Sequence, residues 1–167
     1  MEENNVMRTI KIEKVVLSVG ATAQELEKGV RLLKYLTGRT PAKMRSRKRI
    51  PSWGVRPGLE VGTVITIRKN PEEILKKMLA AEDNKLKKKQ VSVNNFSFGI
   101  KEYIEIPGVE YQRDIGIMGL DITIVFKRTG RRVKLRKVKR GKIPQRQHIS
   151  KDEIIKFMED NFHTEFI

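Results

Sequence analysis

Few side chains in this chain of 167 residues could carry out acid–base or nucleophilic chemistry. Glu102, Glu105 and Asp121 could supply a carboxylate pair, and His148 could act as a base. The chain has no Gly-rich phosphate loop with its lysine, no dinucleotide fingerprint, no nucleophile elbow and no metal-ligand spacing. We therefore expect that the protein is not an enzyme and holds no metal or cofactor. Asp121 would instead meet a backbone amide or an arginine.

The chemistry that the composition favours is binding to a polyanion. Residues 39–58, which we name the basic loop, contain seven Lys or Arg; residues 127–148, the basic extension, contain eleven, and neither segment contains Asp or Glu. The other 18 basic residues are balanced by 20 acidic ones, so the net charge of +16 arises from these two segments. Clustered like charge disfavours a compact chain unless a polyanion binds and releases counterions. RNA is the expected partner.

The two basic segments differ in kind. Three prolines and two glycines exclude a long helix from the basic loop, and a strand that leads into a loop is expected there. The only tryptophan, Trp53, could stack on an unpaired base or a flipped ribose, or could pack its ring against the domain. The basic extension is so poor in apolar residues that we expect it to become ordered only against phosphates.

Membrane binding is not indicated. No basic amphipathic helix with a large apolar face is visible, no apolar run approaches the roughly 20 residues that span a bilayer, and the N-terminus lacks the apolar core of a signal peptide. The chain has no cysteine, so it has no disulfide framework. We expect a cytoplasmic protein that forms one domain, residues 1–167.

Three helices and three strands are visible in the pattern. A capping residue is followed three positions later by Glu at Thr22, Asn70 and Ser150, and each pair precedes an amphipathic stretch. Alternating segments predict strands at 10–20, 63–69 and 121–127. These elements favour an α+β fold, a two-layer sandwich in which helices cover one face of a mostly antiparallel sheet. The open face and the basic loops would then meet RNA.

Several motifs occur in an order that resembles one family over nearly the whole chain. They are IEKVVLSVG (12–20), LTGRTP (36–41), GVRPG (54–58), ITIR (65–68), NNFSFGIKEYIEIPG (94–108) and IGIMGLDITI (115–124). Together they resemble the universal L-five family of large-subunit ribosomal proteins, called L-eleven in eukaryotes. The basic extension followed by QHISKDEIIKFMEDNF resembles the archaeal and eukaryotic branch, so the chain is identified as an archaeal-type member.

The resemblance implies a structural role in the large ribosomal subunit. Proteins of this family bind 5S rRNA, help to attach it in the central protuberance, contact 23S-type rRNA, and lie beside other 5S-associated large-subunit proteins. The family's basic loop reaches toward the P-site tRNA, and the family bridges the two subunits through the small-subunit protein of family thirteen.

The resemblance and the charge pattern together suggest site residues. For 5S rRNA, Thr66 keeps the family's residue, whereas Ser18 stands in place of Asn and Arg39 in place of Gln. The full set expected at 5S rRNA is Ser18, Arg39, Lys43, Arg45, Thr66 and Arg68. The basic loop would present Arg47, Lys48, Arg49, Trp53 and Arg56 to rRNA or P-site tRNA. The basic extension would present Arg131, Arg132, Lys134, Arg136, Lys137, Lys139, Arg140, Lys142 and Arg146 to rRNA.

Two other functions use the same charge. A nucleic-acid-modifying enzyme would also hold its substrate on basic surfaces, and a free RNA chaperone would bind 5S rRNA away from the ribosome. Turnover of RNA with Mg²⁺ would identify the first, and failure to sediment with mature subunits would identify the second.

Overall fold

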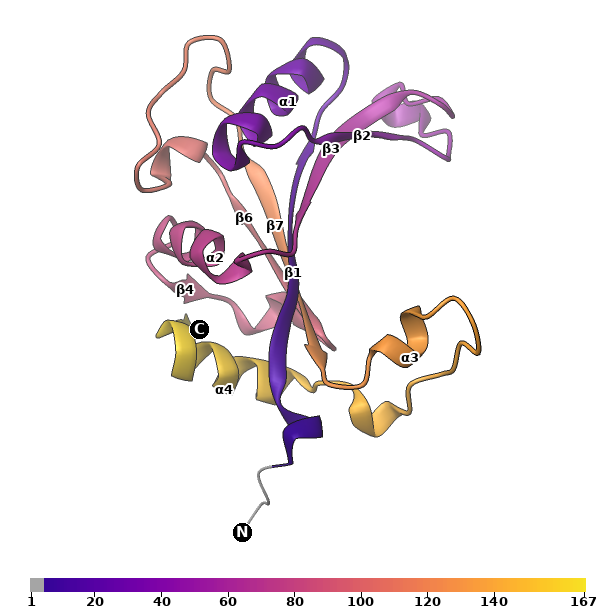
Figure 1. The fold of residues 1–167 in the computed structure, drawn as a ribbon. Coiled ribbons are helices and arrows are strands. Elements are labelled where there is room, and N and C mark those ends of the chain that lie inside the picture. The colour runs from indigo at the N-terminus through magenta and orange to yellow at the C-terminus, as the bar shows by residue number, and fades with distance from the viewer. Residues whose placement is uncertain (1–4) are drawn as a thin grey trace. The chain divides into compact units, whose positions relative to one another are not determined.

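The computed structural model describes residues 5–167 (Figure 1). The helices are α1 (Ala23–Thr37), α2 (Pro71–Ala80), α3 (Arg132–Leu135) and α4 (Lys151–Phe162). The strands are β1 (Ile10–Gly20), β2 (Ala42–Arg45), β3 (Glu60–Ile67), β4 (Lys85–Leu86), β5 (Val91–Ser92), β6 (Asn95–Ile100), β7 (Leu120–Arg128) and β8 (Glu165–Phe166). Single 3₁₀ turns connect several of these elements.

Six of the strands form one sheet in the order β2-β3-β1-β7-β6-β5, and β4 pairs with β8 in parallel. The pairs β2–β3 and β5–β6 are antiparallel. The predicted α+β class with a mostly antiparallel, open sheet is therefore confirmed. The described residues divide into two compact units: residues 5–15, 68–98 and 123–167 form unit 1, and residues 16–67 and 99–122 form unit 2.

In unit 2, α1 covers one face of the strands. Its buried stripe includes Leu26, Leu32 and Leu33. A glycine, Gly29, lets the helix approach the sheet, because a Cβ atom there would lie 3.1 Å from Val19 Cγ1 and 3.2 Å from Thr63 Cγ2. Burial of this stripe is the main source of stability for a helix of this length.

In unit 1, α4 and a row of aromatic rings form the core. Phe126 of β7 stacks against Phe96 of β6 with centroids 5.9 Å apart and meets Phe157 of α4 edge-on at 5.6 Å. These geometries are the favoured ones for aromatic pairs. In the part of β7 that belongs to unit 1, Ile124 and Phe126 are buried whereas Lys127 is exposed, so the predicted alternation of that strand is correct.

The predicted helix starts are correct, but only one capping box forms. Ser150 accepts a hydrogen bond from the Glu153 backbone N–H and the Glu153 carboxylate accepts one from the Ser150 N–H, as predicted. Thr22 and Asn70 make no such bond. Asn70 is left-handed (φ 47°), which directs its side chain away from the first turn, and Ala23 after Thr22 is also left-handed (φ 51°).

Two further expectations need correction. The strand predicted at 63–69 ends at Ile67, so Arg68 lies exposed just beyond the strand and not within it. The basic extension is not without local structure: α3 and a 3₁₀ turn at Gln145–Gln147 lie within it (Figure 1). Its backbone and arginine hydrogen bonds, described below, supply order that composition does not reveal.

Candidate nucleic-acid interface

The face of the unit 2 sheet opposite α1 carries two residues predicted to bind RNA. Ser18 of β1 and Thr66 of β3 are both half-buried there, while Val19 and Ile65 point to the other face and are buried. The Ser18 hydroxyl donates to the backbone carbonyl of Asp121 on β7, with an Oγ–O distance of 3.4 Å. This placement follows from the alternation of the strands predicted at 10–20 and 63–69, because side chains alternate along a strand.

Asp121 belongs to the same side of β7 as Thr123, and its side chain is exposed. The Asp121 carboxylate makes no hydrogen bond or ion pair with any other residue in the range 5–167, so the expected amide or arginine partner is not present. The candidate acids do not converge either, because Glu102 and Glu105 flank or lie within a 3₁₀ turn at Tyr103–Glu105.

The root of the basic loop lies on the α1 side of the sheet. Lys43 of β2 is paired directly opposite Thr63, which faces α1, and Arg45 is opposite Glu60. Lys43 therefore meets Glu27 of α1 in an ion pair and lies 3.6 Å from Glu60. Lys43 and Arg45 thus do not share a face with Ser18 and Thr66, although all four were expected at one RNA.

These ion pairs perturb the titration of their members. The hydrogen bond to Lys43 lowers the pKa of Glu27 from its usual value, and the same bond raises the pKa of Lys43. Both groups are at the surface, so the pair contributes little to stability. It does occupy Lys43, which would have to leave two carboxylates before it could neutralise a phosphate.

Beyond its root, the basic loop is a hydrogen-bonded hairpin. Ser46 N–H donates to Leu59 O at 2.8 Å, Gly58 N–H donates to Ser46 O at 2.8 Å, and Ile50 and Val55 exchange two backbone bonds. The tip is a 3₁₀ turn at Pro51–Trp53 whose tryptophan is 76% exposed. Trp53 therefore does not pack its ring against the domain, and its faces are free to stack.

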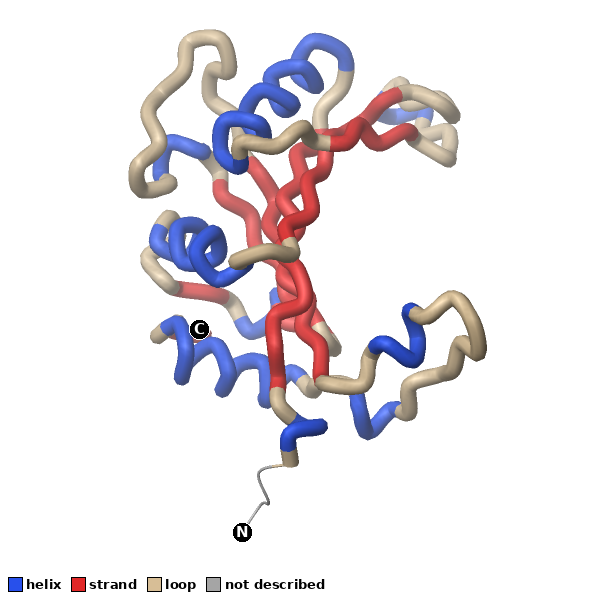
Figure 2. The backbone as a smooth tube through the Cα atoms, in the orientation of Figure 1, coloured by secondary structure: helices blue, strands red, loops and turns tan. Residues whose placement is uncertain are grey.

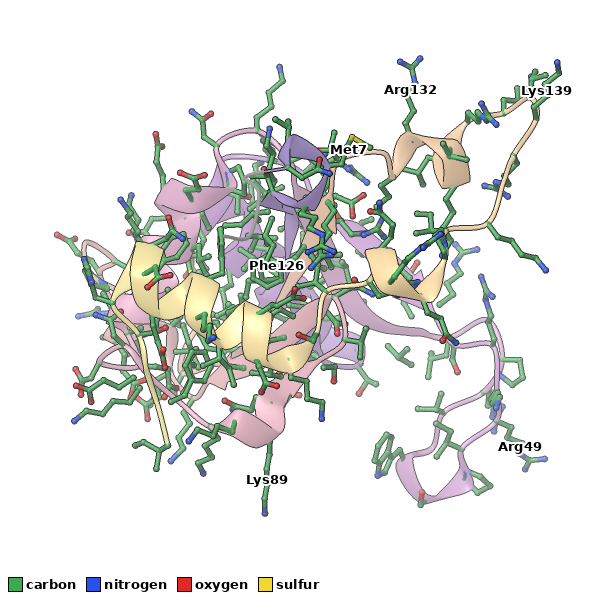
Figure 3. All side chains as sticks on the ribbon, turned by 90° about the horizontal axis from the view of Figure 1, so that it is seen from below. Met7, Arg49, Lys89, Phe126, Arg132 and Lys139 are labelled. Atoms are coloured by element: carbon green, nitrogen blue, oxygen red, sulfur yellow. The ribbon has the colours of Figure 1, made fainter. Side chains whose placement is uncertain are left out.

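The other cations of the basic loop, on either side of β2, are exposed and form no ion pair within the described part of the chain. Arg49 projects from the hairpin (Figure 3). These exposed cations are Arg39, Arg47, Lys48, Arg49 and Arg56.

Two arginines hold the basic extension to the body of unit 1. Arg128 is only 9% exposed; its guanidinium contacts the Glu153 carboxylate and donates to Arg146 O at 3.3 Å. Arg131 donates to Phe126 O at 3.0 Å and lies 2.7 Å from the Glu13 carboxylate. Both ends of the extension are thus bound by charge-assisted contacts, which are stronger than neutral hydrogen bonds.

Glu153 serves two contacts at once, the helix cap and Arg128. Burial acts to raise its pKa, but hydrogen bonds from Ser150 and the charge of Arg128 together outweigh burial, so its pKa lies below the usual range.

A second polar cluster involves Asn94 and His148. The Asn94 side-chain oxygen accepts a hydrogen bond from Ile149 N–H at 2.9 Å, and the Asn94 amide nitrogen lies 2.8 Å from His148 Nδ1. His148 therefore has a structural partner rather than a position suited to a general base.

The other cations of the basic extension are exposed or line a hollow, and none forms an ion pair with residues 5–167. Figure 3 shows Arg132 and Lys139 projecting outward. The set is Lys127, Arg132, Lys134, Arg136, Lys137, Lys139, Arg140, Lys142 and Arg146.

Residues 101–118, which we name the acidic loop, connect β6 to β7 with a single 3₁₀ turn and otherwise run as loop (Figure 2). Sequence reasoning did not single out the exposed side chains of this loop. Four acids and two bases lie in it, and Ile104, Tyr111 and Ile117 are 38%, 54% and 69% exposed. Tyr103 anchors the loop: it is fully buried and its hydroxyl accepts from Gln112 N–H at 2.8 Å. Apolar side chains among acids at 101–118 were the signal that could have identified it.

Within residues 5–167, no helix is long and apolar enough to cross a membrane. In the same range, no three His, Cys, Asp or Glu side chains come together in a way that could hold a metal ion.

The fold and the exposed cation sets are typical of a structural protein that binds RNA. Comparison with known sequences identifies the family: residues 5–56 match "Ribosomal protein L5", and residues 60–157 match the C-terminal region of the same family. The chain belongs to this family of large-subunit ribosomal proteins. Such proteins are structural components of the ribosome and not enzymes, so the predicted lack of catalysis and the predicted location in cytoplasmic ribosomes are confirmed.

Archaeal relatives match over nearly their whole length. "Large ribosomal subunit protein uL5" of Nanoarchaeum equitans is 40% identical over 165 residues, which cover 96% of this chain and 98% of the relative. The protein of the same name from Sulfolobus acidocaldarius is 38% identical over 167 residues, covering 98% and 94%. The predicted archaeal-type membership is therefore confirmed.

Proposed function

We propose that this large-subunit protein binds 5S rRNA and helps to attach it to the subunit in the central protuberance. The observation that carries the proposal is the separation of its cations into two classes. Lys43, Arg45, Arg128 and Arg131 are paired with carboxylates, whereas the other cations of the two basic segments face solvent without such partners. Exposed, unpaired cations are the groups that exchange counterions for RNA phosphates.

Polar groups, more than charge, would fix the position of the protein on 5S rRNA. Ser18 and Thr66 lie on the open face of the unit 2 sheet, where hydroxyls can reach riboses or base edges. Arg39 is exposed one residue after the left-handed end of α1 and offers a planar fork that suits a phosphate. Arg68, exposed after β3, adds a phosphate contact.

The two basic segments would divide the remaining RNA contacts. The basic loop presents Trp53 at its tip and unpaired cations along its sides, a combination that suits rRNA or the P-site tRNA. The basic extension would bind 23S-type rRNA. Because both segments belong to one chain, which we propose to act as a single domain, engagement of one raises the effective concentration of the other.

The acidic loop is the surface best suited to a protein partner. A net negative loop repels RNA, and its exposed Ile117, Tyr111 and Ile104 resemble the apolar anchors of protein interfaces. We assign to it the inter-subunit contact with the small-subunit protein of family thirteen. Ile117→Ser should weaken subunit joining and leave 5S binding unchanged; unchanged joining would remove the loop from the bridge.

The central proposal is tested by titrating the purified protein with 5S rRNA and with a tRNA, from about 50 to 200 mM salt, over which non-specific binding weakens steeply. We expect 5S affinity to persist at the upper end while tRNA affinity is lost. If both affinities fall together, charge alone accounts for binding and the specific 5S role is wrong. Sedimentation with mature large subunits then separates a resident component from a chaperone that acts off the ribosome.

A further inference from the structure

A hollow of about 750 Å³ lies in unit 1, where the basic extension folds back on itself. Its volume is within the range of roughly 300 to 1,000 Å³ found for sites that hold small ligands. The wall combines apolar side chains with cations, and no Asp or Glu of the described residues lines it. Of the lining residues, the argument rests on Met7, Val133, Ile143, Lys127, Lys134 and Lys142.

Local contacts of the basic extension form the hollow. Gly141 N–H donates to Val133 O at 3.1 Å, and Arg140 Nε donates to Lys134 O at 2.8 Å, so the chain after α3 returns against the helix. Gly141 permits this approach, because a Cβ atom there would lie 2.9 Å from Val133 Cγ1. Figure 3 shows Lys139 at the far end of this loop and Arg132 directed outward.

The N-terminal turn at Val6–Arg8 contributes the apolar side chain of Met7 to the wall. Thr129 donates its hydroxyl to Val6 O at 3.2 Å, which holds the turn beside the end of β7. Met7 Cε lies 3.0 Å from the position of a Cβ on Gly130. Met7 is 43% exposed, so part of the side chain stays free for a ligand.

Phosphate binding alone does not account for this wall. A phosphate backbone is held by cations on an open surface and needs no apolar lining. Yet Val133 and Leu135 are 38% and 59% exposed in the segment of highest charge, where apolar exposure has no evident structural purpose. An unstacked RNA base offers the complement, since it presents a flat, weakly hydrated face attached to a phosphate.

We propose that this hollow receives one unstacked nucleotide of RNA. The base lies against Val133, Ile143 and Met7, and the adjoining phosphates meet Lys127, Lys134 and Lys142, which have no carboxylate partner among residues 5–167. The inference deepens the rRNA role proposed for the basic extension and rests on it. It predicts that the extension distinguishes an unpaired nucleotide from a paired one, in addition to binding the charge of the phosphates.

The direct test is methyl NMR of the full chain with adenosine and uridine 5′-monophosphates, and with ribose 5-phosphate as a control that lacks the base. We expect both nucleotides to shift the methyl signals of Val133 and Ile143, and ribose 5-phosphate to leave them in place. The methyls of Val138, which is 72% exposed and does not line the hollow, are the internal reference. Equal shifts with ribose 5-phosphate, or no shifts with any probe, would overturn the proposal.

A matched pair of variants tests the hollow on RNA without any change in charge. Val133→Ser should weaken binding to a single-stranded RNA oligonucleotide several-fold with an unchanged salt slope, because an apolar contact with the base is lost and the phosphate contacts are kept. Val138→Ser should bind like the parent. Equal binding by both variants, with intact 5S selectivity in the parent, would refute the hollow alone. Loss of 5S selectivity in the parent itself would refute the proposed function instead.

Discussion

The basic loop and the basic extension carry the same kind of charge but are attached to the protein in different ways. Lys43 at the root of the loop is 36% exposed and its partner Glu27 is 58% exposed, so water screens their attraction. Arg128 at the root of the extension is 9% exposed, and it joins Glu153 to the carbonyl of Arg146. The loop instead relies on backbone hydrogen bonds of its hairpin.

This difference shows that cations in one run need not share one task. Buried and paired arginines shape the extension, whereas the exposed cations beside them remain available to RNA. In the loop the pairing is with surface carboxylates, which compete with RNA for Lys43 without holding the fold. In the extension, substitution of a paired arginine should therefore change the stability of the fold, and substitution of an exposed cation should change RNA binding. In the loop, substitutions should change mainly the affinity for RNA.

The largest effect is expected when the exposed cations of the extension are neutralised together. Changing Arg132, Arg136, Lys137 and Lys139 to Gln should lower the salt slope of rRNA binding by roughly three units, since each phosphate contact contributes about 0.7 to 0.9. Assembly into the subunit should weaken more than binding to isolated 5S rRNA, measured by sedimentation and by titration. Four exposed lysines on α1 and α4, changed in the same way, are the charge-matched control: Lys28, Lys34, Lys151 and Lys156. Equal losses in the two assays would contradict the proposal that the extension binds 23S-type rRNA while other residues bind 5S rRNA.

Arg128→Met should destabilise the fold by about 2 kcal/mol, because hydrogen bonds to a charged group are lost from a largely buried side chain. Denaturant unfolding measures the change. The control Arg132→Met removes an exposed cation and should alter stability by no more than about 0.5 kcal/mol. Equal stabilities of the two variants would show that Arg128 is not an anchor.

Within the loop, Lys48→Gln should flatten the salt slope of RNA binding by about one unit. Lys43→Gln should change the slope less, since Lys43 is already neutralised by Glu27 and Glu60. Glu27→Gln releases Lys43 from its closer partner and should raise RNA affinity. A larger slope change for Lys43→Gln than for Lys48→Gln would show that Lys43, and not Lys48, is the cation that meets phosphate.

Thr66→Val tests the open face, because it keeps the shape and removes one hydroxyl. We expect 5S affinity to fall by about 0.5 to 1.5 kcal/mol if one hydrogen bond is lost. Thr123→Val on β7, a residue outside the proposed 5S set, is the matched control. An unchanged 5S affinity with an intact fold would remove Thr66 from the interface.

The smallest effect concerns pH. The pKa of Glu153 in the folded protein is below its ordinary value of 4.5, so the ionised group stabilises the fold above that value, and this contribution is lost as the pH falls through the folded pKa. As the pH falls from above 4.5 through the lowered folded pKa, the parent should therefore lose more stability than Glu153→Gln, measured by unfolding at each pH. Parallel pH profiles would show that the Arg128 and Ser150 contacts do not act through this carboxylate.

Local signals predicted the regular elements well. The span of β1, the end of α1 at Gly38 and the start of α4 at Ser150 follow from alternation, a left-handed glycine and a capping box, all of which act within a few residues. The family was likewise evident from motifs alone. The strands β5 and β6 and helix α3 were not predicted, because elements of two to six residues are too short to show a clear periodicity.

The sequence by itself determined the fold class, the family, the two basic segments and the sheet face of Ser18 and Thr66, because periodicity and charge are local properties of the chain. Only the tertiary structure decided which cations are paired, since Glu13, Glu27 and Glu153 lie far along the chain from the arginines and lysine that they contact. It also decided that Trp53 faces solvent and that the basic extension closes around a hollow. The wall of that hollow includes Met7 and Asn94, which lie far along the chain from the extension, and no local pattern encodes contacts between such distant segments.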